Sequence, residues 1–264
     1  MECPSDLHPS VRPLRRWLGL HSGAVAGDVR DQFSFSEYDG HLRVITTTGE
    51  SWDESSETFV RVLREGDGEL REVGSVGDMG NGEAVQSVRM IGDVGYVVTF
   101  RQVDPFYTLD LSDPENPKVV GELKIPGFSS YLHPIGNGRV LGVGSDGTDD
   151  GFITGSKVSI FDVSDPADPQ EVAIWSAPDG WTDVGWDHRS FLWWEAEQLA
   201  VVPVQIWSEG WAGAVVLKVE GNEFVNEGSA ATFVRNHSST PVQLKGNRIP
   251  LRWVTPLRGA GDVN

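Results

Sequence analysis

Two stretches of this chain are near copies of each other, and an internal repeat of this kind restricts the fold more than any other feature of the sequence. LDLSDPENPKVVGEL occupies residues 109–123, and FDVSDPADPQEVAIW occupies residues 161–175. When Ser112 is matched with Ser164, the copies lie 52 residues apart. A unit that recurs at this spacing indicates a fold assembled from similar supersecondary units.

Further strand-turn-strand segments extend the repeat to four copies. Short apolar alternations punctuated by Gly, Asn, Asp and Pro recur throughout, whereas helical periodicity is almost absent. The first strand pair of each copy is expected at 32–49, 86–102, 130–146 and 189–205. The second pair is expected at 59–76, in the two near copies, and at 215–230.

The spacing of these units predicts the fold class. Alignment of the last strands at Glu72, Val119, Glu171 and Phe224 gives steps of 47, 52 and 53 residues, which is the size of a β-propeller blade. We therefore expect an all-β chain, a β-propeller of four-stranded antiparallel blades. About four blades are present, which would make an incomplete ring.

The shared S-D-P-x-x-P core could be a cation site, a recognition motif or a turn. In the other two copies the same place is filled by REGDGEL and VEGNEF, which share turn chemistry with it but no set of ligands. Asp113 and Asp165 can each accept a hydrogen bond from the backbone two residues further on, and proline interrupts the strand. We interpret the motif as the connection between the third and fourth strands of a blade.

A family resemblance agrees with this reading. The run VTFRQVDPFYTLDLSDPENPKVVGELKIPGFSSYLHP, followed by GSKVSIFDVSDPADP and DHRSFLW, resembles the secreted β-propeller domain family of archaea and bacteria, which is distantly related to WD40-type repeats. The resemblance covers about residues 32–228. It implies an extracellular or cell-surface protein with no established reaction. Members are typically longer, with an export signal and further blades, so this chain resembles a truncated member.

Both ends depart from the repeat. Residues 1–29 are expected to be an atypical, poorly ordered leader, residues 30–229 the blades, and residues 230–264 an off-pattern basic tail that sums to +4. The segment 14–27 has paired arginines and an A-x-A-like end, but His21 and Ser22 interrupt its apolar run, so it is not a convincing signal peptide.

Charge and composition exclude several partners. The formal net charge is −18, with 39 acidic and 21 basic residues, so the chain should repel nucleic acid and anionic membrane surfaces. No run of 18 apolar residues exists that could form a membrane-spanning segment. Cys3 is the single cysteine, so no intrachain disulfide can form. The oligomeric state is left open.

One segment resembles a calcium loop. In SDGTDDG, the oxygen-bearing side chains of Asp146, Thr148 and Asp150 occupy alternate positions before Gly151, as in the first half of such a loop. The twelfth position is Lys157 where a bidentate Glu would be needed. We predict no cofactor, with calcium at these three residues as the alternative to a solvent-facing acidic connection.

Two histidines are candidates for ligand binding. His133 and His188 are expected at equivalent ends of inner hairpins in neighbouring repeats, near the central channel of a propeller. There they could bind a ligand or could simply hold strands together. The adjacent Asp187, His188 and Ser190 make a poor catalytic triad, because neighbours on a strand point to opposite faces. No zinc-hydrolase or nucleotide-binding spacing is present.

Tryptophan is concentrated late in the chain. Seven of the ten tryptophans fall within the 37 residues 175–211. Exposed indoles bind sugars and proteins, whereas buried ones fill the space between blades. Trp193, Trp207 and Trp211 are the candidates for ligand binding, and of the adjacent Trp193 and Trp194 at least one should pack inside.

Together these patterns favour a non-enzymatic extracytoplasmic β-propeller scaffold that binds a protein or a cell-envelope glycan. Repeated hairpins account for the sequence without a reactive residue. The alternatives are a hydrolase or lyase with a site in the central channel, and a nonfunctional propeller fragment, because the fold alone does not exclude activity.

Overall fold

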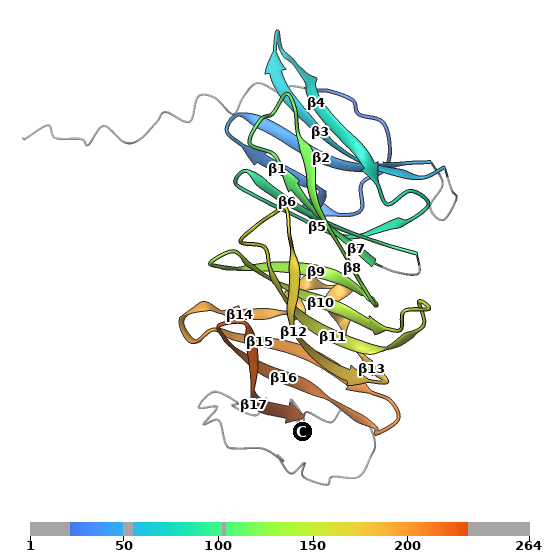
Figure 1. Ribbon diagram of the computed structural model, residues 1–264, viewed down its shortest axis with the longest axis vertical. Coiled ribbons are helices and arrows are strands. Elements are labelled where there is room, and N and C mark those ends of the chain that lie inside the picture. The colour runs from blue at the N-terminus through green and yellow to red at the C-terminus, as the bar shows by residue number, and fades with distance from the viewer. Residues whose placement is uncertain (1–21, 50–54, 102–103, 232–264) are drawn as a thin grey trace, which may run out of the picture.

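The strands of this chain form four antiparallel sheets that follow one another along the sequence (Figure 1). The computed structural model describes residues 22–49, 55–101 and 104–231. The predictions of a poorly ordered leader and of an off-pattern basic tail concern mainly residues 1–21 and 232–264, which lie outside the described residues. Within the described part, Asp28 bridges to Thr47 of the first sheet.

Each sheet is one blade. Blade 1 contains β1 (Phe35–Tyr38), β2 (His41–Thr48), β3 (Glu57–Gly66) and β4 (Glu69–Met79). Blade 2 contains β5 (Ala84–Ile91), β6 (Val94–Phe100), β7 (Asp104–Asp110) and β8 (Lys118–Ile125). Blade 3 contains β9 (Phe128–Gly136), β10 (Arg139–Gly147), β11 (Ile153–Asp162) and β12 (Gln170–Pro178). Blade 4 contains β13 (Gly180–Trp181), β14 (Leu192–Trp194), β15 (Leu199–Ile206), β16 (Trp211–Glu220) and β17 (Glu223–Ala231).

The hairpins use the turn residues that the sequence indicated. Asp39 and Gly40 join β1 to β2 with φ values of 47° and 74°, and Asn137 and Gly138 join β9 to β10 with φ values of 52° and 65°. Two consecutive positive φ angles belong to the type I′ turn, whose twist matches that of the flanking strands. Asp and Asn tolerate this conformation, and Gly adopts it without a steric penalty.

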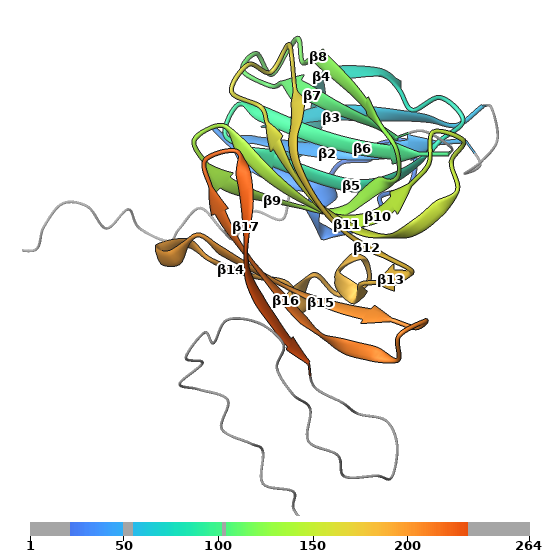
Figure 2. The same ribbon diagram turned by 60° about the horizontal axis from the view of Figure 1, so that its bottom comes forward.

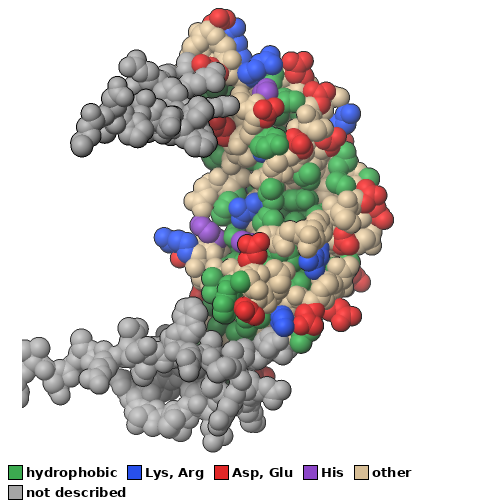
Figure 3. Space-filling view, turned by 90° about the vertical axis from the view of Figure 1, so that its left-hand side faces the viewer, with side chains coloured by type: hydrophobic (Ala, Val, Ile, Leu, Met, Phe, Trp, Pro, Cys, Tyr) green, Lys and Arg blue, Asp and Glu red, His purple; other side chains and the backbone are tan. Residues whose placement is uncertain are grey.

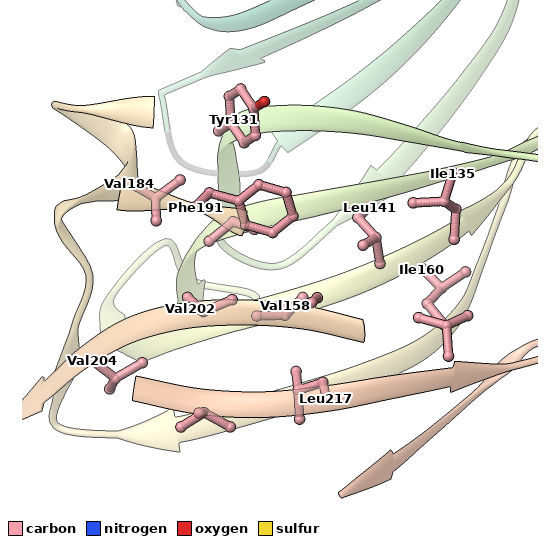
Figure 4. Packing of buried hydrophobic residues seen from close by; sticks show 14 of the residues in the cluster. Tyr131, Ile135, Leu141, Val158, Ile160, Val184, Phe191, Val202, Val204 and Leu217 are labelled. Carbon is pink, nitrogen blue, oxygen red and sulfur yellow. The ribbon is translucent and has the colours of Figure 1, made fainter. Parts of the chain in front are cut away.

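The blades stack face to face in an open arc (Figures 1 and 2). Neighbouring residues on a central strand point to opposite faces, and both are buried, because a blade packs on each side. Val97 joins the core between blades 1 and 2, whereas Val98 joins the core between blades 2 and 3. Leu141 and Val158 pack against Val202 and Leu217 between blades 3 and 4 (Figure 4). The prediction of an incomplete ring of four-stranded blades is confirmed.

The S-D-P-x-x-P motif is a turn, as its replacement by other turn sequences indicated. The backbone N–H of Glu115 donates to the Asp113 carboxylate at 3.1 Å, and that of Ala167 donates to the Asp165 carboxylate at 3.0 Å. The aspartate that ends the preceding strand, Asp110 or Asp162, accepts hydrogen bonds from the serine of each motif. The two copies therefore share one hydrogen-bonding pattern.

These turns also join blades. The turn of blade 2 packs on Gly74 in β4 of blade 1, where a Cβ would lie 2.8 Å from the carbonyl carbon of Glu115. The turn of blade 3 packs in the same way on Gly121 in β8, where a Cβ would collide with the carbonyl oxygen of Pro166. Blade 4 has the short turn VEGNEF instead. On the neighbouring strand β12 of blade 3, Ala173 stands at the position that Gly121 occupies in β8. Glycine thus stands where a long turn approaches the preceding blade.

Two buried cations link neighbouring blades as well. Arg43 of blade 1 donates to the carbonyl oxygen of Gly92 in blade 2 at 2.5 Å. Lys157 of blade 3, which is 2 % exposed, donates to the carbonyl oxygen of Pro126 at 2.6 Å and pairs with Glu171 at 3.3 Å. Each of these cations has polar partners, as a buried charge requires.

Blade 4 differs from the predicted hairpin at 189–205. Its innermost strand is interrupted: β13 pairs with one end of β15 and β14 with the other, and residues 182–191 leave the sheet between them. This insertion contains the short 3-10 helices η3 (Asp183–Gly185) and η4 (His188–Ser190). The expectation that His188 and its neighbours lie on a strand was therefore wrong, because a helical turn replaces the strand there.

Within the described residues, no helix has the length and apolarity that a bilayer crossing would demand.

The contact between blade 3 and Gly121 predicts a stability effect. Gly121→Ala should lower the free energy of unfolding by about 1–3 kcal/mol, because the carbonyl oxygen of Pro166 and the ring of Pro169 leave no room for a methyl group. Gly66→Ala is the matched control, since a Cβ there meets nothing within 4 Å. Urea unfolding of both variants measures the difference. Equal stability of the two variants would contradict the blade-joining role of the turn.

Candidate functional site

The arc of blades has a concave side (Figure 3). The insertion in blade 4 packs against β9, the first strand of blade 3. The Thr182 hydroxyl accepts from the backbone N–H of Val184 and so caps η3, and the Asp187 carboxylate accepts from that of Arg189 and so caps η4. Val184 and Phe191 are buried in the core between blades 3 and 4 and hold both ends of the insertion. The residues between them are thereby presented to the concave face.

A second segment faces this insertion. Just before blade 1, Asp31 caps η2 (Gln32–Ser34) by accepting from the backbone N–H of Phe33 at 2.8 Å. The Phe33 ring lies 5.0 Å from the ring of His188, and the side-chain amide of Gln32 lies 3.2 Å from Nε2 of His188. Segments 156 residues apart in sequence are thus in contact across the concave face.

Aromatic rings and an arginine form the floor of the concave face. Tyr131 of β9 contacts the rings of Phe33 and His188, at 5.8 and 6.0 Å between centroids. The Arg89 guanidinium of β5 lies 3.9 Å from the centroid of the Phe33 ring, and its Nε donates to the carbonyl oxygen of Leu132 at 2.9 Å. Among the described residues, no carboxylate lies within ion-pair distance of Arg89.

His133 is neutral at neutral pH. Its Nδ1 lies 3.2 Å from the Tyr131 hydroxyl, and its ring lies 5.1 Å from that of Phe191. Burial, and then the positive charge of Arg89, lower the pKa of His133 from 6.5 to about 4. A neutral imidazole can accept a hydrogen bond from a ligand, but it makes no charged contact with one.

Two adjoining cavities open on the concave face. The first, about 680 Å³, lies between η2, β9 and the insertion, and the second, about 640 Å³, extends toward β10 and β11. Both are lined by Arg30, Ser130, Gly185 and Trp186. These four residues therefore form the boundary between the cavities.

The two cavities differ in charge. The first is lined by Arg30 and Asp31 and by the pair Asp187 and Arg189. Arg189 donates to both carboxylate oxygens of Asp187, at 2.8 and 3.1 Å, and these hydrogen bonds lower the pKa of Asp187. The first cavity therefore has no net charge from these four residues.

The second cavity is lined mainly by uncharged groups. Arg30 is its one charged lining residue in the described part of the chain, beside Trp181 and Trp186. The Ser156 side chain lines the same cavity, is 3 % exposed, and its buried hydroxyl has no hydrogen-bond partner. Such a group costs free energy until something bonds to it.

The structure brings some of the predicted residues together. His133 and His188 both lie against Tyr131, and Trp193 contacts the His133 ring from the core side, with centroids 6.3 Å apart. Trp193 packs inside whereas Trp194 is 44 % exposed, as the alternation predicted.

Two predicted tryptophans lie elsewhere. Trp207, 70 % exposed, belongs to the connection between β15 and β16, and Trp211 packs against the core. Neither lines the two cavities. A role for them in binding stays a prediction.

Of the predicted calcium residues, Asp146 lies near the end of β10, and Thr148 lies in the connection between β10 and β11. The Asp146 carboxylate accepts from the backbone N–H of Gly147, and the Thr148 hydroxyl accepts from that of Phe152. Asp150 lies in the same turn. Among the described residues no three His, Cys, Asp or Glu side chains gather closely enough to hold a metal ion. Calcium binding at Asp146, Thr148 and Asp150 stays a prediction.

The triad-like run around His188 is engaged in local contacts. The Ser190 hydroxyl donates to the carbonyl oxygen of Asp187 at 2.7 Å, the Asp187 carboxylate holds Arg189, and the His188 ring contacts Gln32. These bonds fix the shape of the insertion.

Sequence reasoning did not select Arg30, Tyr131, Ser156 or Trp186 as site residues. The insertion itself had a visible signal: strand alternation stops after Gly180 and resumes near Phe191, and the capping residues Thr182 and Asp187 lie between. The other residues are brought to the site only by the stacking of the blades.

Comparison with known proteins is consistent with this architecture. The model of a family described as beta propeller domain matches residues 19–248. An uncharacterised protein of Methanocaldococcus jannaschii is 39 % identical over 205 residues, which is 77 % of this chain and 31 % of the relative. An uncharacterised protein of Archaeoglobus fulgidus is 47 % identical over 174 residues, 66 % of this chain and 26 % of the relative. The chain thus spans less than a third of each relative.

Among solved structures, the chain is similar to the acylaminoacyl peptidase of Pyrococcus horikoshii. The TM-score is 0.44 at 13 % identity, over 77 % of this chain and 33 % of the peptidase chain.

The environment of His133 predicts a pH dependence of stability. Its pKa of about 4 in the folded chain is lower than its ordinary value of 6.5, so the unfolded chain takes up the proton first. This group should therefore make stability fall as the pH drops from about 6.5 to about 4. In His133→Gln, urea unfolding over this range should show a shallower dependence. An unchanged slope would contradict the neutral state of the imidazole.

Proposed function

Because this chain belongs to the beta propeller domain family, we propose that it is a non-enzymatic binding module whose concave face takes a glycan of the cell envelope. The site is the pair of cavities bounded by Arg30, Ser130 and Trp186. Propellers also host enzymes, so this proposal rests on the site and not on the fold.

The observation that carries the proposal is the exposure of Trp186. Its side chain is 82 % exposed although it lies at the boundary of two cavities, and Trp181 beside it is 43 % exposed. Large apolar side chains that are exposed in a hollow incur a cost that ligand contact relieves. An indole face can stack on the apolar face of a sugar ring, and the hydroxyl groups around the cavity can bond to those of the sugar.

The histidine, aspartate and serine side chains near the cavities favour a binding role over a catalytic one, because they are engaged in structural contacts. His133 is buried against aromatic rings, and the groups of Asp187 and Ser190 bond to their own insertion. A hydrolytic mechanism needs a nucleophile and a base within hydrogen-bond reach of each other. In this region those groups stabilise the insertion.

A glycan also fits the dimensions better than a protein. The cavities, about 680 and 640 Å³, are of the size that small ligands occupy. A stable protein partner would need roughly 800 Å² of surface on each side. The family resemblance favours an extracellular or cell-surface setting, where envelope glycans are accessible.

Substitution of Trp186 tests the proposal. Trp186→Ala should weaken binding of a trisaccharide by at least about tenfold, because the stacking surface is lost. The matched control is Trp207→Ala, which removes an exposed indole outside both cavities and should change the affinity by less than about twofold.

The measurement is isothermal titration calorimetry with a panel of neutral and acidic trisaccharides. If no trisaccharide of the panel binds, or if Trp207→Ala weakens binding as much as Trp186→Ala, the proposed function is wrong.

A further inference from the structure

From the charges around the two cavities, we propose that the site selects an acidic saccharide and binds its carboxylate through Arg30. This inference rests on the proposed function and specifies its ligand class. The saccharide would place one uronic acid in the second cavity and its neighbouring uncharged sugars in the first.

Arg30 is the charged residue that the two cavities share. Burial lowers its pKa, the charge of the neighbouring Asp31 opposes this, and an arginine side chain stays protonated in a protein. Among the described residues, none places a carboxylate within ion-pair distance of it. Its guanidinium is therefore open to a bidentate contact with the planar carboxylate of a ligand.

The two cavities differ in the charges of their lining residues. The first cavity is lined by two acidic and two basic residues, of which Asp187 and Arg189 form an ion pair. In the second cavity Arg30 faces only uncharged lining residues within the described part of the chain. The second cavity is therefore the one that favours a negative charge.

A second cation, Arg89, lies beside the first cavity. Arg89 lies under the Phe33 ring, which lines the first cavity, and is also without a carboxylate within ion-pair distance in the described residues. Its charge adds to the positive potential of the concave face. His133 adds none, because it is neutral at neutral pH.

The uncharged part of the second cavity has an aromatic surface. Trp181 and Trp186, which are 43 % and 82 % exposed, line this cavity. A sugar ring in the cavity would contact these indoles while its carboxylate bonds to Arg30. A simple anion such as phosphate would meet Arg30 but would leave the indoles without a contact.

The net charge of the chain limits the kind of acidic glycan. At −18, the surface as a whole repels a polyanion, and the attraction is confined to the concave face. A saccharide with one carboxylate near its end avoids most of that repulsion. We therefore expect a single acidic sugar on a neutral chain as the preferred ligand.

The test uses two probes of the same shape. One is a neutral disaccharide extended by a terminal glucuronic acid, and the other is its carboxyl-reduced counterpart, which ends in glucose. The full chain should bind the acidic probe at least about tenfold more tightly in calorimetry, since a charge-assisted pair is lost in the reduced probe.

Variants assign the preference to residues. Arg30→Gln should remove the preference, whereas Arg71→Gln, an exposed arginine that pairs with Asp67 and Glu69 in blade 1, should retain it. Thermal melting of each variant, compared with the parent chain, identifies any loss of fold, and Arg30→Lys, which keeps the charge, should retain part of the preference.

The outcomes separate this inference from the proposed function. Equal affinity of the parent chain for both probes, or a preference that survives in Arg30→Gln, would overturn the acidic-saccharide inference and leave glycan binding intact. If neither these probes nor the trisaccharide panel bind, both proposals are wrong. Preference for the acidic probe that Arg30→Gln abolishes and Arg71→Gln retains supports the inference.

Discussion

The two middle sheets, blades 2 and 3, bury both of their faces, and the arrangement of everything else depends on that packing. Adjacent residues such as Val97 and Val98, or Ile160 and Phe161, are almost fully buried although they point in opposite directions. A strand of this kind is stable only with a sheet on each side. The chain therefore stacks blade on blade, and its hydrophobic cores lie between blades.

Close approach of the blades places demands on small details of the sequence. The long S-D-P-x-x-P turns reach back to the preceding blade, and glycine is found where their backbone arrives, at Gly74 and Gly121. Where the next blade has a short turn, Ala173 takes the equivalent place. Turn length and the residue on the neighbouring strand are thus matched across blades.

The candidate site is a product of the same stacking. Arg30 precedes blade 1, Arg89 belongs to blade 2, Tyr131 to blade 3, and Trp186 to the insertion of blade 4. No blade alone contains the site.

Much of the fold could be predicted from the sequence, and less of the site. Hairpins follow from Asp-Gly and Asn-Gly turns and from local alternation, which are readable within a few residues. The insertion was missed because η3 and η4 are single turns with no helical periodicity. His188 lies in η4 and not on the strand that the sequence predicted. Ser156 looks like any polar strand residue, and only tertiary packing shows that its hydroxyl is buried beside a cavity.

Ligand binding between Arg30 and the indoles of the insertion is tested most directly by titrating the ¹⁵N-labelled chain with the glucuronic acid-terminated trisaccharide. The indole N–H signals are followed in NMR spectra and assigned by single Trp substitutions. We predict that the signals of Trp181 and Trp186 shift with saturation and that the signal of Trp207 stays in place. A shift of Trp207 alone, or unchanged signals of Trp181 and Trp186 in the presence of bound saccharide, would contradict the account.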